Sequence, residues 1–277
     1  MKRKKIILSV AICVVFVLSA AISVYAGTHK KVGTTGAQFL KIGIGARPIA
    51  MGGTYAGIAD DINTIYWNPA GLGQINDHEL LAQHIVWFQS VNYDYLAYAQ
   101  PIGKIGTFGL AVNYLYMNDI EKRTGDTENP EGTFGATDGA FTIAYGKKLG
   151  DNFSLGLNLK YIRQTIDIEK ANGAAVDLAG LFKVANKLQV GMVVQNLGPK
   201  IKFISEGDPL PLNIKLGVGY KLFKDRLTLG LDANYPIDNK PNANLGIEYC
   251  FKFGNFSFPI RAGYKTLNDF KTIDGLG

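Results

Sequence analysis

Cysteine, histidine and tryptophan are scarce in this 277-residue sequence, which contains two, three and two of them respectively. Cys13 lies in an N-terminal apolar run, so Cys250 is the only cysteine in the rest of the chain. One cysteine can form neither an intrachain disulfide nor a cysteine-ligated metal site. His29, His78 and His84 are too widely spaced to share a metal ion without other ligands. The sequence therefore predicts no metal and no cofactor.

Patterns typical of catalysis are also missing. We recognise no serine nucleophile motif and no paired-carboxylate cleft, so we expect no catalytic residues and no enzymatic activity. The glycine-rich segment 43–57 has neither a Walker lysine nor a complete G-x-G-x-x-G motif, which argues against phosphate binding. Asp60 and Asp61 could hold a metal or form a catalytic dyad, but adjacent carboxylates in a polar loop are usually solvated or cap a helix.

Net charge is small once the first residues are set aside. Basic residues 2–5 precede an apolar run over residues 6–23, and Val24-Tyr25-Ala26 has the small-residue spacing of a signal-peptidase site. We expect residues 1–26 to be a signal peptide, with an uncleaved membrane anchor as the alternative. Cleavage after Ala26 removes four basic residues and lowers the formal charge from +6 to +2. The mature chain therefore lacks the basic surface that nucleic-acid binding requires.

Beyond residue 26 there is no apolar run long enough for a membrane helix, so residence in a membrane would require strands. From residue 77 onward, apolar and polar residues alternate with period two, as in a strand with one apolar face. The pattern is clearest over 153–161, 212–222 and 227–235, and each of these runs has about the 10 residues that a tilted strand needs to cross a bilayer. Weaker copies occur at residues 78–89, 91–101, 105–117, 137–149, 173–184, 187–197, 243–253 and 255–267.

These segments predict about eleven strands of an all-β, transmembrane, antiparallel up-and-down β-barrel in an outer membrane. Short turns near residues 102, 151, 186, 225 and 254 alternate with wider connections over 118–136, 167–172, 198–211 and 236–242, as in bacterial barrels. A soluble β-sandwich would also alternate. Two features favour the barrel. Tyrosines recur on the apolar face near strand ends, and the opposite face is rich in glycine but also carries charged residues. We assign these charged residues to the lumen: Lys160, Asp177, Lys215, Asp232, Glu248 and Arg261.

The same assignment places Leu216 towards lipid and Gly217 towards the lumen. It predicts that Leu216→Arg is costly and Gly217→Ser far less so.

The segment before the strands does not alternate. It contains Ala46-Arg47-x-x-Ala50-Met51-Gly52-Gly53, then Ala59-Asp60-Asp61, then Tyr66-Trp67-Asn68-Pro69-Ala70-Gly71-Leu72. Its glycines allow close backbone packing, and Asn68-Pro69 should end any preceding helix. These features suit a compact plug. In this order, between a signal peptide and a run of strands, the motifs resemble those of the PorV/PorQ family, which belongs to the FadL-like outer-membrane barrels.

The resemblance implies a barrel of fourteen strands with the N-terminal segment folded into the lumen as a hatch. We therefore divide the chain into the signal peptide 1–26, a hatch 27–76 and a barrel 77–277, which we expect to be truncated at its C-terminal end because only about eleven strands are present. The matching positions assign hatch residues with a gating or structural role: Met51, Gly52, Gly53, Asp60, Asp61, Asn68, Pro69 and Ala70.

Two functions remain open at this point. The resemblance to PorV implies a component of a type IX-like secretion and surface-attachment system, with secretion-system proteins and their exported substrates as partners. The wider FadL-like group implies a channel for hydrophobic small molecules such as fatty acids and aromatic hydrocarbons. A structural barrel without any ligand is a third possibility. Either way we expect the chain in the outer membrane of a Gram-negative-type bacterium, surrounded by lipid. The small or charged lumen positions favour the secretion role over an apolar uptake route.

Overall fold

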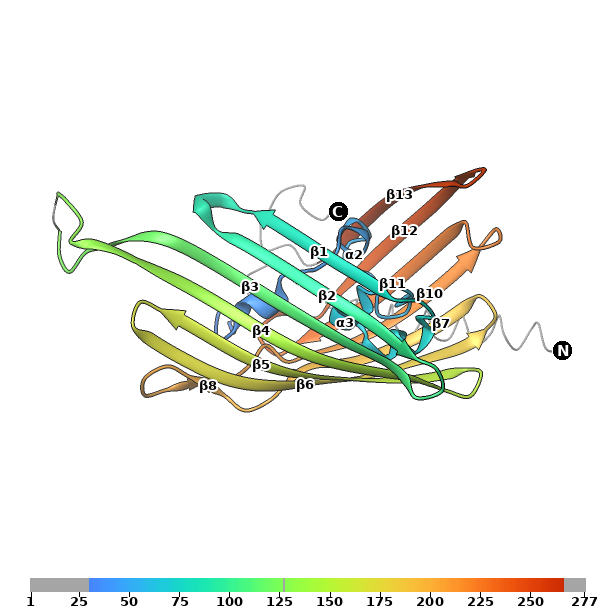
Figure 1. The fold of residues 1–277 in the computed structure, drawn as a ribbon, viewed down its shortest axis with the longest axis horizontal. Helices are drawn as coiled ribbons and strands as arrows, with labels where there is room; N and C mark the ends of the chain where they lie inside the picture. The colour runs from blue at the N-terminus through green and yellow to red at the C-terminus, as the bar shows by residue number, and fades with distance from the viewer. Residues whose placement is uncertain (1–29, 127, 267–277) are drawn as a thin grey trace.

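The computed structural model describes residues 30–126 and 128–266. The signal peptide predicted for residues 1–26 lies outside these ranges. Most of the described chain is one antiparallel sheet in which each strand pairs with its neighbour in the sequence, curled around an N-terminal segment (Figure 1).

The sheet contains eleven strands in the order β1-β2-β3-β4-β5-β6-β7-β10-β11-β12-β13, which confirms the predicted up-and-down topology and strand number. A separate two-stranded hairpin, β8 and β9, lies in the connection between β7 and β10. The strands span Glu79–Val86 (β1), Asn92–Ile102 (β2), Gly106–Lys122 (β3), Gly132–Leu149 (β4), Phe153–Ile166 (β5), Glu169–Ala185 (β6), Leu188–Leu197 (β7), Ile201–Lys202 (β8), Gly207–Asp208 (β9), Asn213–Leu222 (β10), Leu227–Pro236 (β11), Asn242–Phe253 (β12) and Phe256–Lys265 (β13).

One of the predicted wide connections is wrong, and a second is narrower than predicted. Residues 167–172 were expected to form an open loop, but β5 and β6 pair up to Ile166 and Glu169 and leave a two-residue turn. The strands β3 and β4 likewise remain paired as far as Lys122 and Gly132, well into the expected loop 118–136. In both cases polar side chains continue the ladder beyond the apolar stretch, so hydropathy alone underestimates the strand length.

The two faces of the sheet differ in burial as the alternation predicts. On β5, Asn158 is fully buried whereas its neighbour Leu159 is 50% exposed. Large apolar side chains are exposed on the outer face of almost every strand; examples are Leu96, Leu110, Ile143, Leu155, Met192 and Ile247. An apolar outer face of this kind suits contact with lipid.

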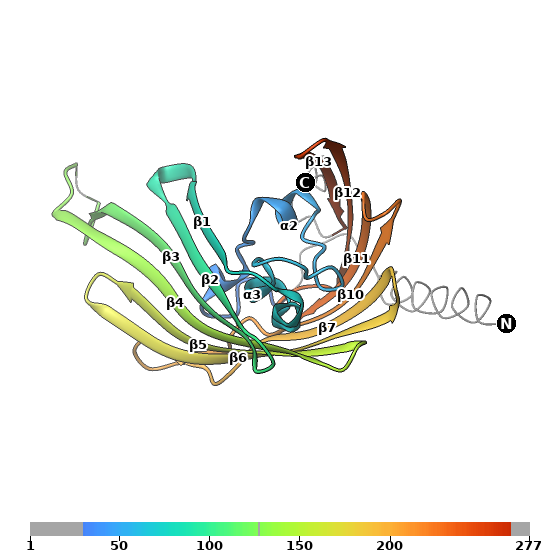
Figure 2. The ribbon, with the colours of Figure 1, turned by 45° about the vertical axis from the view of Figure 1, so that its right-hand side comes forward.

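The concave face of the sheet holds residues 30–76, which we call the hatch (Figure 2). Its regular elements are short: η1 (Gln38–Lys41), α2 (Ala46–Ala50), α3 (Thr64–Trp67) and η2 (Pro69–Gln74). A further turn, η3 (Phe88–Ser90), joins β1 to β2. None of the described helices has the length and apolarity needed to cross a membrane.

The edges of the sheet are β1 and β13, which are not paired with each other within residues 30–126 and 128–266. Hatch residues lie between these two edges in Figure 2 and contact the inner side of β13. The family resemblance implies fourteen strands. In the described part of the chain, the main sheet contains eleven.

Candidate functional site

The inner wall of the sheet carries glycine where the hatch backbone crosses it. Gly219, Gly230, Gly246 and Gly263 pair in register across β10, β11, β12 and β13. A Cβ atom at any of the four would lie less than 3.0 Å from a hatch atom, and at Gly246 it would meet the carbonyl oxygen of Met51 at 2.7 Å. Only glycine permits so close an approach. This row therefore forms the seat for hatch residues 51–58.

A second seat lies on the opposite side of the lumen. Gly146 of β4 and Gly156 of β5 are direct cross-strand partners, and η2 rests on them through Pro69 and Ala70. A Cβ at Gly156 would collide with the Pro69–Ala70 peptide. The two seats fix the hatch to both halves of the curled sheet.

Between these seats the hatch forms the hydrophobic core of the molecule. Its fully buried side chains Phe39, Ile44, Ile65 and Leu72 pack against the inner face of β2 to β6, where the wall residues are small. These wall residues are mainly alanines: Ala97, Ala99, Ala111, Ala140, Ala144, Ala171 and Ala175. The small side chains of the wall leave room for the hatch inside the sheet. Because the hatch packs directly against them, the lumen is filled by protein in this region.

Arg47 is the centre of an ionic network between the hatch and the wall. Its Nη1 atom lies 2.6 Å from Asp60 Oδ1 and 2.8 Å from Asp61 Oδ2. Its Nε and Nη2 atoms each donate to Glu248 of β12 at 2.9 Å. Lys221 of β10 pairs with Asp60 and Arg261 of β13 pairs with Glu248, each at 2.5 Å. Three cations thus balance three carboxylates at this interface.

The network also sets the protonation of Asp60. Burial by itself would raise the pKa of this carboxyl, but Arg47 and Lys221 hold the pKa below its usual value. Asp60 and Asp61 are therefore held by a guanidinium group. This arrangement explains the adjacent carboxylates without a metal ion.

Polar side chains of the strands bind the backbone of the hatch. Asp232 of β11 is fully buried and accepts hydrogen bonds from the backbone N–H groups of Tyr55 and Ala56, both at 2.9 Å. Asn158 of β5 donates to the Ile65 carbonyl at 2.8 Å, and Gln195 of β7 donates to the Tyr66 carbonyl at 2.8 Å. These bonds satisfy backbone groups that a buried irregular segment would otherwise leave unpaired.

The structure places the six charged residues assigned to the lumen on the inner face, where they fall into separate groups. Lys160 pairs with Asp177 at 2.7 Å, and this carboxylate also accepts from the backbone N–H of Asn196. Glu248 and Arg261 belong to the Arg47 network, and Asp232 binds the hatch backbone. Lys215 lies over the Trp67 ring, with Nζ 4.4 Å from the ring centre. All six are buried or half-buried, so the lumen at this level is a packed polar network.

The hatch motif residues have structural roles at the two seats. Met51 is fully buried, and Gly52 and Gly53 adopt φ angles of 67° and 78°, which favour glycine. Asn68 follows α3 and caps η2 by accepting from the N–H of Ala70 at 3.1 Å, while its amide donates to the Ala56 carbonyl at 2.5 Å. Asn68 therefore ties the two halves of the hatch together.

Sequence reasoning missed three parts of this interface: the partners of Arg47, the role of Lys221 and the glycine rows. A signal for the rows was present, because glycine recurs at inward positions of consecutive strands. The ion pairs had no comparable signal, since Arg47 and Glu248 lie 201 residues apart.

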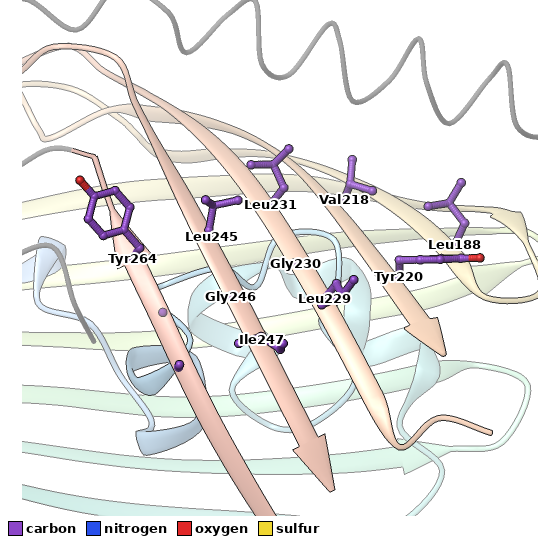
Figure 3. Close-up of a pocket in the computed structure, with 12 residues that line it drawn as sticks. Leu188, Val218, Tyr220, Leu229, Gly230, Leu231, Leu245, Gly246, Ile247 and Tyr264 are labelled. Carbon is purple, nitrogen blue, oxygen red and sulfur yellow. The ribbon is translucent and has the colours of Figure 1, made fainter. Parts of the chain in front are cut away.

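The outer face is hollowed on the side away from the hatch. An apolar depression of about 550 Å³ runs over β10 to β13, with Gly230 and Gly246 at its floor and Leu229, Leu245 and Tyr264 among its walls (Figure 3). Its lining is apolar, as expected for a surface that faces acyl chains.

The curled up-and-down sheet with an apolar outer face and an N-terminal hatch on its inner wall defines the class of outer-membrane β-barrel proteins. The sequence of residues 25–235 matches the family described as type IX secretion system protein PorV. The chain belongs to this family, which confirms the resemblance seen in the motifs.

The fold is similar to those of solved outer-membrane channels. The Pseudomonas putida toluene transporter TodX shares 13% identity with a TM-score of 0.51, covering 81% of this chain and 84% of the transporter. A deltaS2 mutant of the TodX monoaromatic hydrocarbon channel has a TM-score of 0.55 at 12% identity, covering 85% and 86%. At such identities the similarity establishes the fold alone. No curated protein sequence matches this chain.

Proposed function

We propose that this chain is a non-enzymatic, partner-binding component of a type IX secretion system in the outer membrane. The observation that carries the proposal is the fixed hatch: it occupies the inside of the sheet, rests on glycine at both walls and is joined to three strands through the Arg47 network. Membership of the PorV family supports the same role.

The inner wall argues against a route for hydrophobic small molecules. Sites for such ligands are lined mainly by apolar side chains. Here the wall beside the hatch carries buried charged residues, including Lys160, Asp177 and Asp232, and their hydrogen bonds would be broken by an apolar guest. The buried charged residues of the inner wall therefore favour a function in which the partners of this protein bind outside the lumen.

A projecting hairpin offers a surface for such partners. β3 and β4 contain 17 and 18 residues, whereas about 10 suffice to cross the hydrocarbon layer. In Figure 1 these strands extend beyond their neighbours. Lys122, the last residue of β3, pairs with Asp167 in the β5–β6 turn at 2.6 Å, which links the outer end of the hairpin to that turn. The β5–β6 turn lies at the same end as the hairpin, whereas the turns 103–105, 150–152, 186–187, 223–226 and 254–255 lie at the opposite end of the strands. If those five turns are periplasmic, the hairpin points to the cell exterior.

The proposal is tested in the native bacterium by deleting the gene and restoring it with variants. One variant replaces residues 123–131 at the hairpin tip by a Gly-Ser sequence of equal length; the control replaces the turn 150–152 by Gly-Ser-Gly. We expect the deletion and the tip variant to retain type IX substrates inside the cell, and the control to secrete them. Normal secretion in the deletion strain would contradict the proposal, and loss of monoaromatic hydrocarbon uptake in that strain would favour the channel instead.

A further inference from the structure

A polar cavity of about 300 Å³ lies between the hatch and the inner wall, near the start of β10 and beside the connection 237–241 between β11 and β12. Hatch residues Tyr66 and Trp67 form an aromatic side, and the wall contributes asparagine and lysine. This cavity is separate from the Arg47 network, since Arg47 is not among its lining residues. Its volume is at the lower end of the range for small-molecule sites.

Two amides in the cavity have unused hydrogen-bonding capacity. The side-chain oxygens of Asn213 and Asn244 are buried and have no hydrogen-bond partner among the described residues. Asn244 is only 6% exposed, so bulk water has little access to it. An unpaired buried amide oxygen costs about 1–3 kcal/mol, and a rotation of the side chain that turns this oxygen towards a ligand hydroxyl in the cavity would recover that free energy.

The cavity is also positively charged. Lys215 is 7% exposed and forms no salt bridge within the part of the chain that the structure describes; the same holds for Lys265 at the end of β13. Asp238 is the one carboxylate among the lining residues, and it is already neutralised by Lys41 at 2.7 Å. Its oxygen Oδ2 also accepts from the Thr35 hydroxyl at 2.8 Å. Among the described residues, the cavity therefore has two ammonium groups that form no salt bridge.

We infer that this cavity binds a small hydroxylated carboxylate of the sugar-acid class. The ligand carboxylate pairs with Lys215 and Lys265, and its hydroxyl groups pair with the amides of Asn213 and Asn244, which accept and donate as hydroxyls do. A hydrocarbon of the same size would bury those amides and ammonium groups without partners, so the cavity selects against it. This inference is independent of the secretion role.

The test is isothermal titration calorimetry of the full-length protein in detergent with D-glucuronate, D-glucose and acetate as probes. We expect D-glucuronate to bind at least about tenfold more tightly than the other two, which corresponds to about 1.4 kcal/mol. D-glucose lacks the carboxylate and acetate lacks the hydroxyls, so each probe tests one half of the recognition. Absence of D-glucuronate binding, or equal binding of D-glucose, would overturn the inference.

Variants locate the binding. Lys215→Gln and Lys265→Gln should each weaken D-glucuronate binding about tenfold, about 1.4 kcal/mol. Lys265 is exposed, so its variant is expected to fold even if the buried Lys215→Gln does not. Lys252→Gln, an exposed residue of β12 outside the cavity, is the matched control and should bind as the unmodified protein does. Binding that is unchanged in Lys265→Gln would place the sugar acid elsewhere and overturn the inference.

Discussion

Arg47 in the hatch and Glu248 on β12 form a two-point ion pair, in which Nε and Nη2 each donate to a different carboxylate oxygen at 2.9 Å. A planar guanidinium bound in this fork geometry fixes direction as well as distance. Because Nη1 of the same side chain binds Asp60 and Asp61, one residue joins two parts of the hatch to the wall. The pair is therefore one of the polar attachments of residues 47–61, together with Lys221–Asp60 and the hydrogen bonds to Asp232.

Replacing Arg47 by alanine should release the hatch. The change leaves Glu248, Asp60 and Asp61 with only Lys221 and Arg261 as cations, and removing one partner of a buried ion pair costs about 2–5 kcal/mol. Denaturant titration followed by the fluorescence of Trp67, in a Trp87→Phe background, measures the change, because Trp67 is 5% exposed in the hatch. Lys122→Ala is the control, since its pair with Asp167 is exposed to solvent and should contribute little to the free energy of unfolding. Equal effects of the two variants would contradict this role of Arg47.

The contacts at the glycine seats predict that a glycine-to-alanine substitution lowers stability at a seat but not at a glycine outside it. Gly156→Ala places a Cβ against the Pro69–Ala70 peptide and should lower the free energy of unfolding by about 1–3 kcal/mol. Gly180→Ala on β6 is the matched control, because its Cβ would meet only the Phe153 ring at an ordinary 3.5 Å. The same denaturant titration in lipid vesicles compares them. If both variants are as stable as the unmodified protein, η2 does not rest on Gly156.

Acid should loosen the hatch through Asp60. The pKa of this group is lowered in the folded state, so its stabilising contribution is complete above its ordinary value of 3.8 and is lost as the pH falls through the lower folded-state pKa. We expect acrylamide quenching of Trp67 to increase below about pH 4. Asp60→Asn should show more quenching at neutral pH and a smaller change on acidification. An Asp60→Asn curve parallel to that of the unmodified protein would assign the acid effect to other carboxyls.

The strands could be predicted from the sequence because a single local rule determines them. Period-two alternation over stretches such as 153–161 reports which face meets lipid, and this does not depend on distant residues. The rule failed where the exposed ladder continues through mostly polar residues, as at Lys122 and Glu169. Beyond the apolar stretch of a strand, backbone pairing with the neighbouring strand determines where the strand ends. A hydropathy pattern contains no information about this pairing.

The interior of the hatch site could be predicted only in part. The alternation placed Gly217 on the inner face, but the expectation that Gly217→Ser costs far less than Leu216→Arg did not take account of the hatch. A Cβ at this position would lie 2.7 Å from Gly57 N and would also collide with Asp232. Close approach between segments more than 150 residues apart depends on the folded arrangement, so the sequence showed the glycines without showing what lies against them.

The most direct test of the account is the ion conductance of the full-length protein in a planar bilayer, compared with a variant that lacks residues 30–76. The hatch contacts the inner wall on both sides of the lumen, so we predict that the intact protein conducts no measurable current and that the deletion variant conducts. A heat-modifiable band on gels would show that the variant still forms a barrel. An intact protein that conducts as much as the deletion variant would contradict the claim that a fixed hatch fills the lumen.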